Sequence, residues 1–235
     1  MYPLAILAGG LATRLHPLTQ QIPKALMDID GEPFIAYQLR LLASRGIGDV
    51  VICAGYLGEM LSAYVGSGDR FGLRVRYSFD GDRLLGTGWA ILKALPLLGQ
   101  RFFVTYGDSY LPCDFAAVQS YFTAGGYSSL MTVYRNRNLW DVSNVAFSDG
   151  QIRVYDKHRR SLEMEYIDYG LGLFDSTVFN EYLPDVAFDL AQVYQAQLAL
   201  GKLAGYEVHE RFYEIGSFSG LDELRMFLSD QKKNK

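Results

Sequence analysis

Three short apolar runs, each ended by glycine, most constrain how this chain can fold. They are Tyr2–Ala8 before Gly9-Gly10, Val50–Ala54 before Gly55, and Phe102–Tyr106 before Gly107-Asp108. Apolar runs of this length predict buried central strands. Helical patterns lie between them, and such alternation is typical of an α/β layered domain with a largely parallel sheet.

The second half of the chain has a different pattern, in which strands follow one another. Helices are expected at Phe34–Arg45, Gly88–Leu95, Asp114–Ala124 and Leu190–Leu200, with Pro96 ending the second. Strands are expected at Ser128–Tyr134, Val142–Phe147, Gln151–Tyr155 and Tyr166–Phe174. The turn residues Ser148-Asp149-Gly150 separate two of these strands, so this region predicts an antiparallel or mixed addition to the sheet.

Neither a repeat nor a Pro/Ser-rich linker divides the 235 residues. We therefore expect one domain over residues 1–228, followed by a short basic tail at 229–235. The length is ample for a sizeable core.

Charge and cysteine content narrow the possible partners. With 22 basic and 26 acidic residues, the net charge of −4 provides no broad cationic face for nucleic acid. Cys53 and Cys113 belong to no CxxC pair, which argues against a zinc site or a disulfide framework. The start lacks a basic segment before its apolar run, and no stretch reaches about 20 apolar residues. We expect a cytoplasmic protein, monomeric or homodimeric, without membrane or nucleic-acid partners.

The loop after the first strand has the composition of a phosphate-binding loop. Gly9-Gly10 lets backbone N–H groups approach an anion, and Arg14 and Lys24 add charged donors. The loop has neither the Walker A nor the GxGxxG spacing. A plain strand-to-helix turn fits the same residues.

Two acids stand where a metal could bind. Asp108 ends the third apolar run, and ligands of open α/β sheets gather at the carboxyl ends of strands. Glu214 lies in the apolar run Tyr213–Gly216, where a buried acid needs a partner. Alternatively, Asp108 caps a turn and Glu214 faces water from an edge strand. From composition alone, the basic cluster Tyr155–Arg160 favours a solvated loop over a binding site.

Taken in order, these segments resemble the sugar-1-phosphate nucleotidylyltransferases, also called NDP-sugar pyrophosphorylases. The resemblance covers about residues 1–228. It rests on Leu7–Arg14 with Pro17–Thr19 and Pro23-Lys24, then Asp30–Phe34, Leu85–Gly88, Tyr106–Asp108, Tyr155–Lys157, Tyr166–Phe174 and Glu214–Gly216. It implies a Rossmann-like three-layer α/β domain with a mostly parallel central mixed sheet and an added antiparallel strand region.

The resemblance also implies an activity, in which a sugar 1-phosphate attacks the α-phosphorus of a nucleoside triphosphate and pyrophosphate leaves. Arg14, Lys24 and Asp108 would be catalytic, and Asp108 and Glu214 would hold Mg²⁺. The nucleotide would contact Leu7, Ala8, Gly9, Gly10, Tyr56, Gly86, Thr87 and Gly88. The sugar phosphate would contact Asp156, Lys157, Asp168 and Gly170.

Several residues depart from the family pattern. Ala12 and Trp89 replace the commoner glycines, Glu214 replaces Asp, and Asp168 replaces Asn, so the sugar identity does not carry over. Compact heptose 1-phosphate guanylyltransferases and N-acetylmuramate 1-phosphate uridylyltransferases both match, which leaves guanylyl or uridylyl transfer to a heptose or amino-sugar 1-phosphate. A nucleotide-sugar-dependent glycosyltransferase and a non-catalytic nucleotide-sensing module are the alternatives. The first usually carries Asp-x-Asp where this chain has Gly107-Asp108-Ser109.

Overall fold

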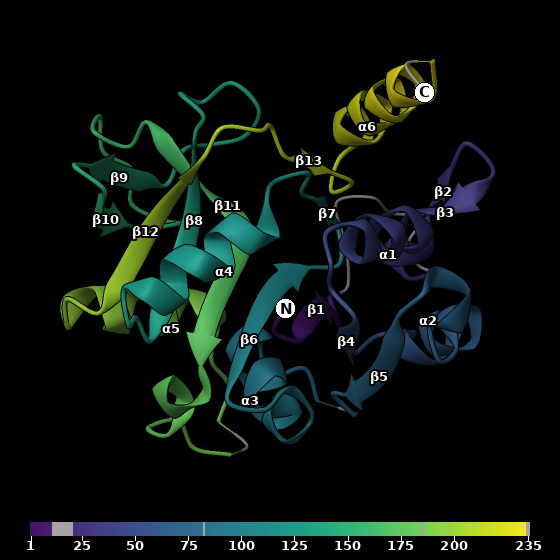
Figure 1. Ribbon diagram of the computed structural model, residues 1–235, viewed down its shortest axis with the longest axis horizontal. Coiled ribbons are helices and arrows are strands. Elements are labelled where there is room, and N and C mark those ends of the chain that lie inside the picture. The colour runs from purple at the N-terminus through teal and green to yellow at the C-terminus, as the bar shows by residue number, and fades with distance from the viewer. Residues whose placement is uncertain (11–20, 82, 185, 234–235) are drawn as a thin grey trace.

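A nine-stranded mixed sheet forms the centre of the protein in the computed structural model, which describes residues 1–10, 21–81, 83–184 and 186–233 (Figure 1). Its strands are β1 (Leu4–Ala8), β4 (Asp49–Ala54), β5 (Arg74–Phe79), β6 (Arg101–Tyr106), β8 (Ser129–Arg135), β9 (Val145–Ser148), β10 (Gln151–Tyr155), β11 (Tyr166–Asp175) and β12 (Leu203–Val208). The strand order β10-β9-β11-β6-β1-β4-β5 has a branch in which β8 joins β11 and β12 joins β8.

The sheet is parallel in its first half and mixed in its second. Strands β6, β1, β4 and β5 pair in parallel. Strand β11 then runs antiparallel to β6, β8 antiparallel to β11, and β9 with β10 forms a hairpin. Asp149 and Gly150 take positive φ at that hairpin, as a tight two-residue turn requires. The expected α/β fold with an antiparallel addition is confirmed.

Helices cover both faces of the sheet because alternate residues of each strand point to opposite faces. Leu4 and Ile6 of β1 pack under α1 (Phe34–Ser44), α2 (Gly58–Val65) and α4 (Phe115–Ala124). Ala5 and Leu7 pack on the opposite face with α3 (Thr87–Leu98) and α5 (Leu190–Ala199). The result is a three-layer domain.

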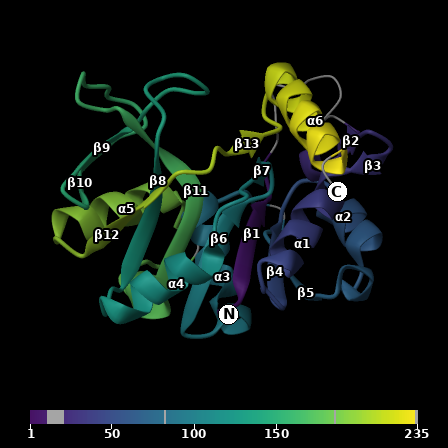
Figure 2. The ribbon, with the colours of Figure 1, turned by 45° about the horizontal axis from the view of Figure 1, so that its top comes forward.

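The last helix, α6 (Phe218–Lys233), packs beside the sheet in a third apolar cluster (Figures 1 and 2). It covers two small pairs, β2 (Asp28–Ile29) with β3 (Glu32–Pro33) and β7 (Ser109–Tyr110) with β13 (Tyr213–Glu214). Phe227 of α6 stacks on Tyr213, with ring centroids 4.3 Å apart. The helix therefore supports the short strand that carries Glu214.

The structure corrects several details of the sequence interpretation. Helix α3 continues through Pro96 to Leu98, because the proline lies in the last turn and removes only one intrahelical N–H. Helix α2 and strands β5 and β12 were not predicted. Helix α6 extends to Lys233, so the expected basic tail is helical over its described part. Among the described residues, no helix is long and apolar enough to cross a bilayer.

Candidate active site

A cavity of about 410 Å³ lies at the carboxyl ends of the parallel strands. The chain runs from β1 to β4 and β5 on one side of β1 and places β6 on the other, and open sheets bind ligands at such a reversal point. The residues that line the cavity are Leu7, Ala8, Gly9, Gly10, Lys24, Ala25, Cys53, Asp80, Leu84, Gly86, Thr87, Ala90, Tyr106, Gly107, Asp108, Asp189 and Gly216.

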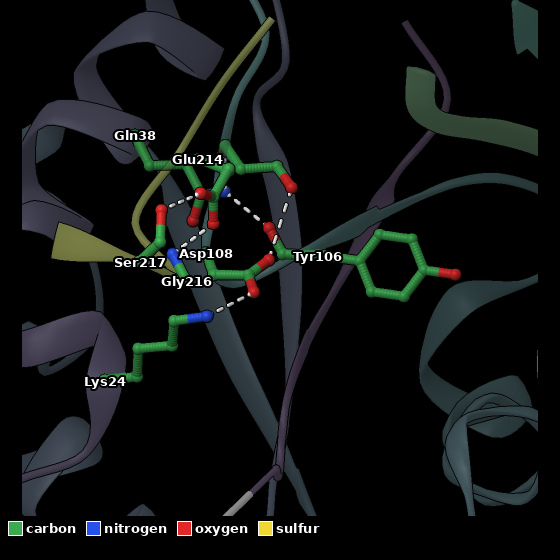
Figure 3. Close-up of polar contacts among 8 residues, drawn as sticks. Lys24, Gln38, Tyr106, Asp108, Glu214, Gly216 and Ser217 are labelled. Carbon is green, nitrogen blue, oxygen red and sulfur yellow. Dashed lines mark hydrogen bonds and ion pairs between the residues drawn. The ribbon is translucent and has the colours of Figure 1, made fainter. Parts of the chain in front are cut away.

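An ion pair between Lys24 and Asp108 forms the charged end of this cavity. Lys24 Nζ lies 2.7 Å from Asp108 Oδ2, and Ser109 Oγ donates to Asp108 Oδ1 at 3.2 Å (Figure 3). The Lys24 side chain is 17% exposed and that of Asp108 is 37% exposed. Both groups thus reach the cavity while packing partly against protein, as groups that bind a substrate should.

Glu214 lies beside this pair because β13 pairs with β7. Glu214 is opposite Ser109 in the register, and the Ile215 N–H donates to the Asp108 carbonyl oxygen at 3.0 Å. The Glu214 carboxylate accepts hydrogen bonds from Ser217 Oγ at 2.7 Å and from the Gly216 N–H. Figure 3 shows the carboxylates of Asp108 and Glu214 in this one group.

Gln38 holds the loop that carries Asp108, although its sequence context gave no signal for such a role. The residue is 2% exposed, and its Nε2 donates to the carbonyl oxygens of Tyr106 at 2.8 Å and Ser109 at 2.7 Å. These two bonds bracket Gly107-Asp108. Helix α1 therefore fixes the direction in which the Asp108 side chain leaves β6.

Three of the four residues expected to bind a sugar phosphate, Lys157, Asp168 and Gly170, lie near Tyr106. Lys157 Nζ lies 5.6 Å from the centroid of the Tyr106 ring. Gly170 takes φ +95 in a bulge of β11, and its N–H donates to Asp168 Oδ1. Asp168 Oδ2 accepts from the Tyr155 hydroxyl at 3.3 Å.

Nearby charges, burial and hydrogen bonds shift the pKa values of the residues in this second group and of Asp156. Burial raises the pKa of Tyr106 to about 12, with Lys157 acting in the opposite direction. For Lys157, burial lowers the pKa, but the Tyr106 hydroxyl and Asp168 outweigh it, so the net pKa is raised and the ammonium stays protonated. Asp156 caps its own turn, since Oδ1 accepts from the N–H groups of His158 and Arg159, and these bonds lower its pKa.

The start of α3 is held by the segment before α5 and does not offer its N–H groups to the cavity. Gly88 and Trp89 both donate to the Phe188 carbonyl oxygen, and Thr87 N–H donates to Asp189 Oδ1. A methyl group on Gly88 would collide with the Phe188 ring. Gly86 and Thr87 line the cavity, whereas Gly88 packs closely against Phe188.

Most of the residues singled out in the sequence are therefore brought together. Seven of the predicted nucleotide and catalytic positions other than Asp108 line the cavity, namely Leu7, Ala8, Gly9, Gly10, Lys24, Gly86 and Thr87. Tyr56 is 38% exposed beside Gly9, with its N–H 3.4 Å from the Gly9 carbonyl oxygen. Arg14 lies outside the described residues.

Sequence reasoning missed Asp80 and Asp189, which also line the cavity. Asp80 follows β5, a strand whose alternating Arg74–Phe79 pattern was available to predict it. Asp189 forms a capping box with Gln192 at the start of α5. Its Asp-x-x-Gln spacing is a helix-start signal.

Comparisons with known proteins agree with this geometry. A family model described as nucleotidyl transferase matches residues 4–230. An N-acetylmuramate α-1-phosphate uridylyltransferase of Neisseria meningitidis is 29% identical over 94% of this chain and 95% of its own length. A D-glycero-α-D-manno-heptose 1-phosphate guanylyltransferase of Campylobacter jejuni is 24% identical over 90% and 93%.

Among solved structures, a Bacillus anthracis protein provisionally assigned as a glucose-1-phosphate thymidylyltransferase, in complex with sucrose, has the same fold. Its TM-score is 0.85 at 22% identity, and the match covers 97% of this chain and 95% of that one.

Proposed function

Because the chain belongs to the nucleotidyl transferase family, we propose that it transfers a nucleotidyl group from a nucleoside triphosphate to a sugar 1-phosphate. The observation that carries the proposal is the Lys24–Asp108 pair, which lies in the same cavity as the Gly9-Gly10 turn. The two relatives described above, which match nearly the whole chain over nearly their own full length, are named for this kind of transfer, onto an amino-sugar derivative and onto a heptose.

The reaction requires the protein to position the two substrates and to neutralise the negative charge of their phosphates. A phosphate oxygen of the sugar 1-phosphate bonds to the α-phosphorus, and the bond from the α-phosphorus to the oxygen that bridges it to the β-phosphorus breaks, so pyrophosphate leaves. Lys24 stabilises the negative charge that shifts among the phosphate oxygens. Lys157, together with Tyr106, holds the phosphate of the incoming sugar.

Further contacts follow from the second group of residues. Asp168 accepts hydrogen bonds from sugar hydroxyls beside the Tyr155 hydroxyl, and Gly170 lets the sugar approach the backbone of β11. Asp156 lies next to Lys157, with one carboxylate oxygen already used in its turn. Arg14, which follows Gly9-Gly10 in the sequence, is proposed on its sequence position to hold the β- and γ-phosphates.

The chemistry of the donor set fits Mg²⁺. Asp108 and Glu214 offer hard carboxylate oxygens from β-strand ends joined by the Ile215 hydrogen bond. Within the described ranges, no group of three or more His, Cys, Asp or Glu side chains could hold a metal alone. Two carboxylates with substrate phosphates supplying the other oxygens are typical of Mg²⁺ sites. Bound there, Mg²⁺ would neutralise charge on the reacting phosphates.

Pyrophosphate release with GTP, UTP, CTP and ATP, each against a panel of sugar 1-phosphates and with Mg²⁺, tests the proposal. We expect release with a heptose or amino-sugar 1-phosphate and GTP or UTP. An Asp108→Asn preparation serves as the control for contaminating activity. Absence of release with every pair would contradict the proposed reaction.

A further inference from the structure

The strand that carries Glu214 forms few backbone hydrogen bonds of its own. Strand β13 is two residues long, and it pairs with β7, which is equally short. An isolated pair of strands is marginally stable in water unless other elements pack on it. The direction in which the Glu214 side chain leaves β13 therefore depends on the side chains that pack around this strand (Figure 3).

Arg211, two residues before Tyr213, contacts three separate parts of the chain. Its guanidinium carbon lies 3.2 Å from the centroid of the Trp140 ring and 4.7 Å from the centroid of the Tyr213 ring. Its Nη2 donates to Glu223 Oε2 of α6. Guanidinium groups stack on aromatic faces, and this attraction is stronger where water is partly excluded. The Arg211 side chain is only 22% exposed.

Trp140 gives Arg211 a fixed surface to pack on, although it lies in the loop between β8 and β9. The Trp140 N–H donates to Asn136 Oδ1 at 3.2 Å. Asn136 is fully buried, and its Nδ2 donates to the Asp141 carbonyl oxygen at 2.6 Å and to Ser143 Oγ at 3.2 Å. These bonds hold the loop on both sides of Trp140.

Tyr213 passes the restraint on to β13. Its ring contacts Arg211 and also stacks on Phe227 of α6, with ring centroids 4.3 Å apart. Glu214 is the next residue in the chain. A shift of Tyr213 therefore moves the Glu214 carboxylate relative to Asp108.

An arginine at this position has a cost. Arg211 Nε is buried and has no hydrogen-bond partner among the residues that the structure describes. A buried donor without an acceptor destabilises a fold, and an apolar side chain could fill the same space without that cost. What the guanidinium adds is a planar stack and a directed ion pair, which fix the orientation of its neighbours.

We propose that Arg211 is a positioning residue, which holds β13 between Trp140 and α6 and so keeps Glu214 beside Asp108. The inference rests on the proposed function, in which these two carboxylates bind Mg²⁺. It assigns no contact with substrate to Arg211. Loss of Arg211 should therefore weaken Mg²⁺ binding and leave the sugar phosphate contacts intact.

The dependence of pyrophosphate release on Mg²⁺ concentration tests this. Residues that orient metal ligands commonly change metal affinity by about tenfold or more when they are removed. Arg211→Met should therefore raise the Mg²⁺ concentration for half-maximal rate about tenfold. The KM for the sugar 1-phosphate should stay nearly unchanged. In a Glu214→Gln background, Arg211→Met should cause no further rise, because its effect passes through that carboxylate.

Hydrogen–deuterium exchange of the whole chain, without metal or substrate, provides a second measurement that does not depend on activity. Backbone amides of residues 211–217 should exchange about threefold faster or more in Arg211→Met than in wild type, because local opening becomes easier. Trp140→Leu removes the aromatic ring but keeps the ion pair between Arg211 and Glu223. It should show a smaller change of the same kind.

Arg225→Met is the matched control, because Arg225 also joins α6 to another element. Its Nη2 donates to the Asp28 carbonyl oxygen of β2 at 3.2 Å. This variant should keep the wild-type Mg²⁺ requirement and the wild-type exchange at 211–217. If Arg225→Met reproduced the effects of Arg211→Met, loosening of α6 in general would explain them and the inference would be wrong.

Two further results would overturn the inference while leaving the proposed function intact. One is a wild-type Mg²⁺ requirement in Arg211→Met, and the other is an equal rise when Arg211→Met is added to Glu214→Gln. If the wild type released no pyrophosphate with any pair of substrates, the proposed function would fail, and the inference would fail with it.

Discussion

The ammonium nitrogen of Lys24 lies 2.7 Å from a carboxylate oxygen of Asp108, across 84 residues of sequence. The pair joins the start of the 3₁₀ helix Lys24–Leu26 to the residue that follows the end of β6 by two positions, and both residues line the cavity. Because both side chains are partly exposed, the pair contributes at most about 1 kcal/mol to stability. Its main effect should therefore be on catalysis.

Lys24→Met should lower kcat by about 10²-fold or more, as expected for loss of one donor to the transition state. The free energy of unfolding should change by no more than about 1 kcal/mol. Pyrophosphate release and urea denaturation measure the two effects. Lys202→Met, which removes an exposed lysine remote from the cavity, is the control. Full activity of Lys24→Met would exclude Lys24 from the reaction.

Asp108→Asn should also lower turnover by about 10²-fold or more, and should raise the Mg²⁺ concentration that gives half-maximal rate. The amide keeps the shape of the side chain but loses the charge that attracts a divalent cation. Turnover measured over a series of Mg²⁺ concentrations separates weaker Mg²⁺ binding from misfolding. Wild-type activity at every Mg²⁺ concentration would make the metal assignment wrong.

Gly9 and Gly10 should respond differently to alanine. At Gly9 the methyl group would meet Asp80 and Gly55, and we expect a loss of about 1–3 kcal/mol of stability. At Gly10 a methyl group has no heavy atom within 4 Å, so the fold should tolerate it. Because Gly10 lines the cavity, the added methyl group should raise the KM for the triphosphate. Equal stability of the two variants in urea would contradict this assignment.

Lys157→Met should raise the KM for the sugar 1-phosphate about tenfold or more while leaving the KM for the triphosphate nearly unchanged. The reason is that Lys157 lies with Tyr106 and Asp168 and, in the described part of the chain, is not among the residues that line the cavity with Gly9 and Gly10. Initial rates with each substrate varied in turn measure this split, with Lys202→Met again as control. A rise in the KM for the triphosphate alone would contradict this prediction, because it would mean that Lys157 contacts the triphosphate and not the sugar 1-phosphate.

The sequence predicted the parallel core because its strands are apolar runs ended by glycine, a local signal that burial on both faces produces. It could not predict that Gln38 fixes the Asp108 loop, since that bond joins a helix residue to backbone 68 residues away. Asp80 escaped for a related reason. The position of its side chain depends on the close approach of Gly9 and Gly55, which only the packing of three strands creates.

The raised pKa of Asp80 should appear in the pH dependence of stability. Because burial raises this pKa from 3.8 to about 6, the unfolded chain ionises first as pH rises. The carboxyl group then destabilises the fold progressively between pH 3.8 and 6, with the full penalty above that range. Asp80→Asn lacks the penalty and should be more stable than wild type at pH 8 by roughly 1–2 kcal/mol, after allowance for solvent screening.

The difference between Asp80→Asn and wild type that comes from this charge should vanish below about pH 3, where both side chains are neutral in the folded and unfolded states. Urea denaturation from pH 3 to pH 8 measures it. Asp149→Asn, whose side chain is 86% exposed, should show no such pH-dependent difference. A constant difference across the range would mean that Asp80 ionises normally in the fold.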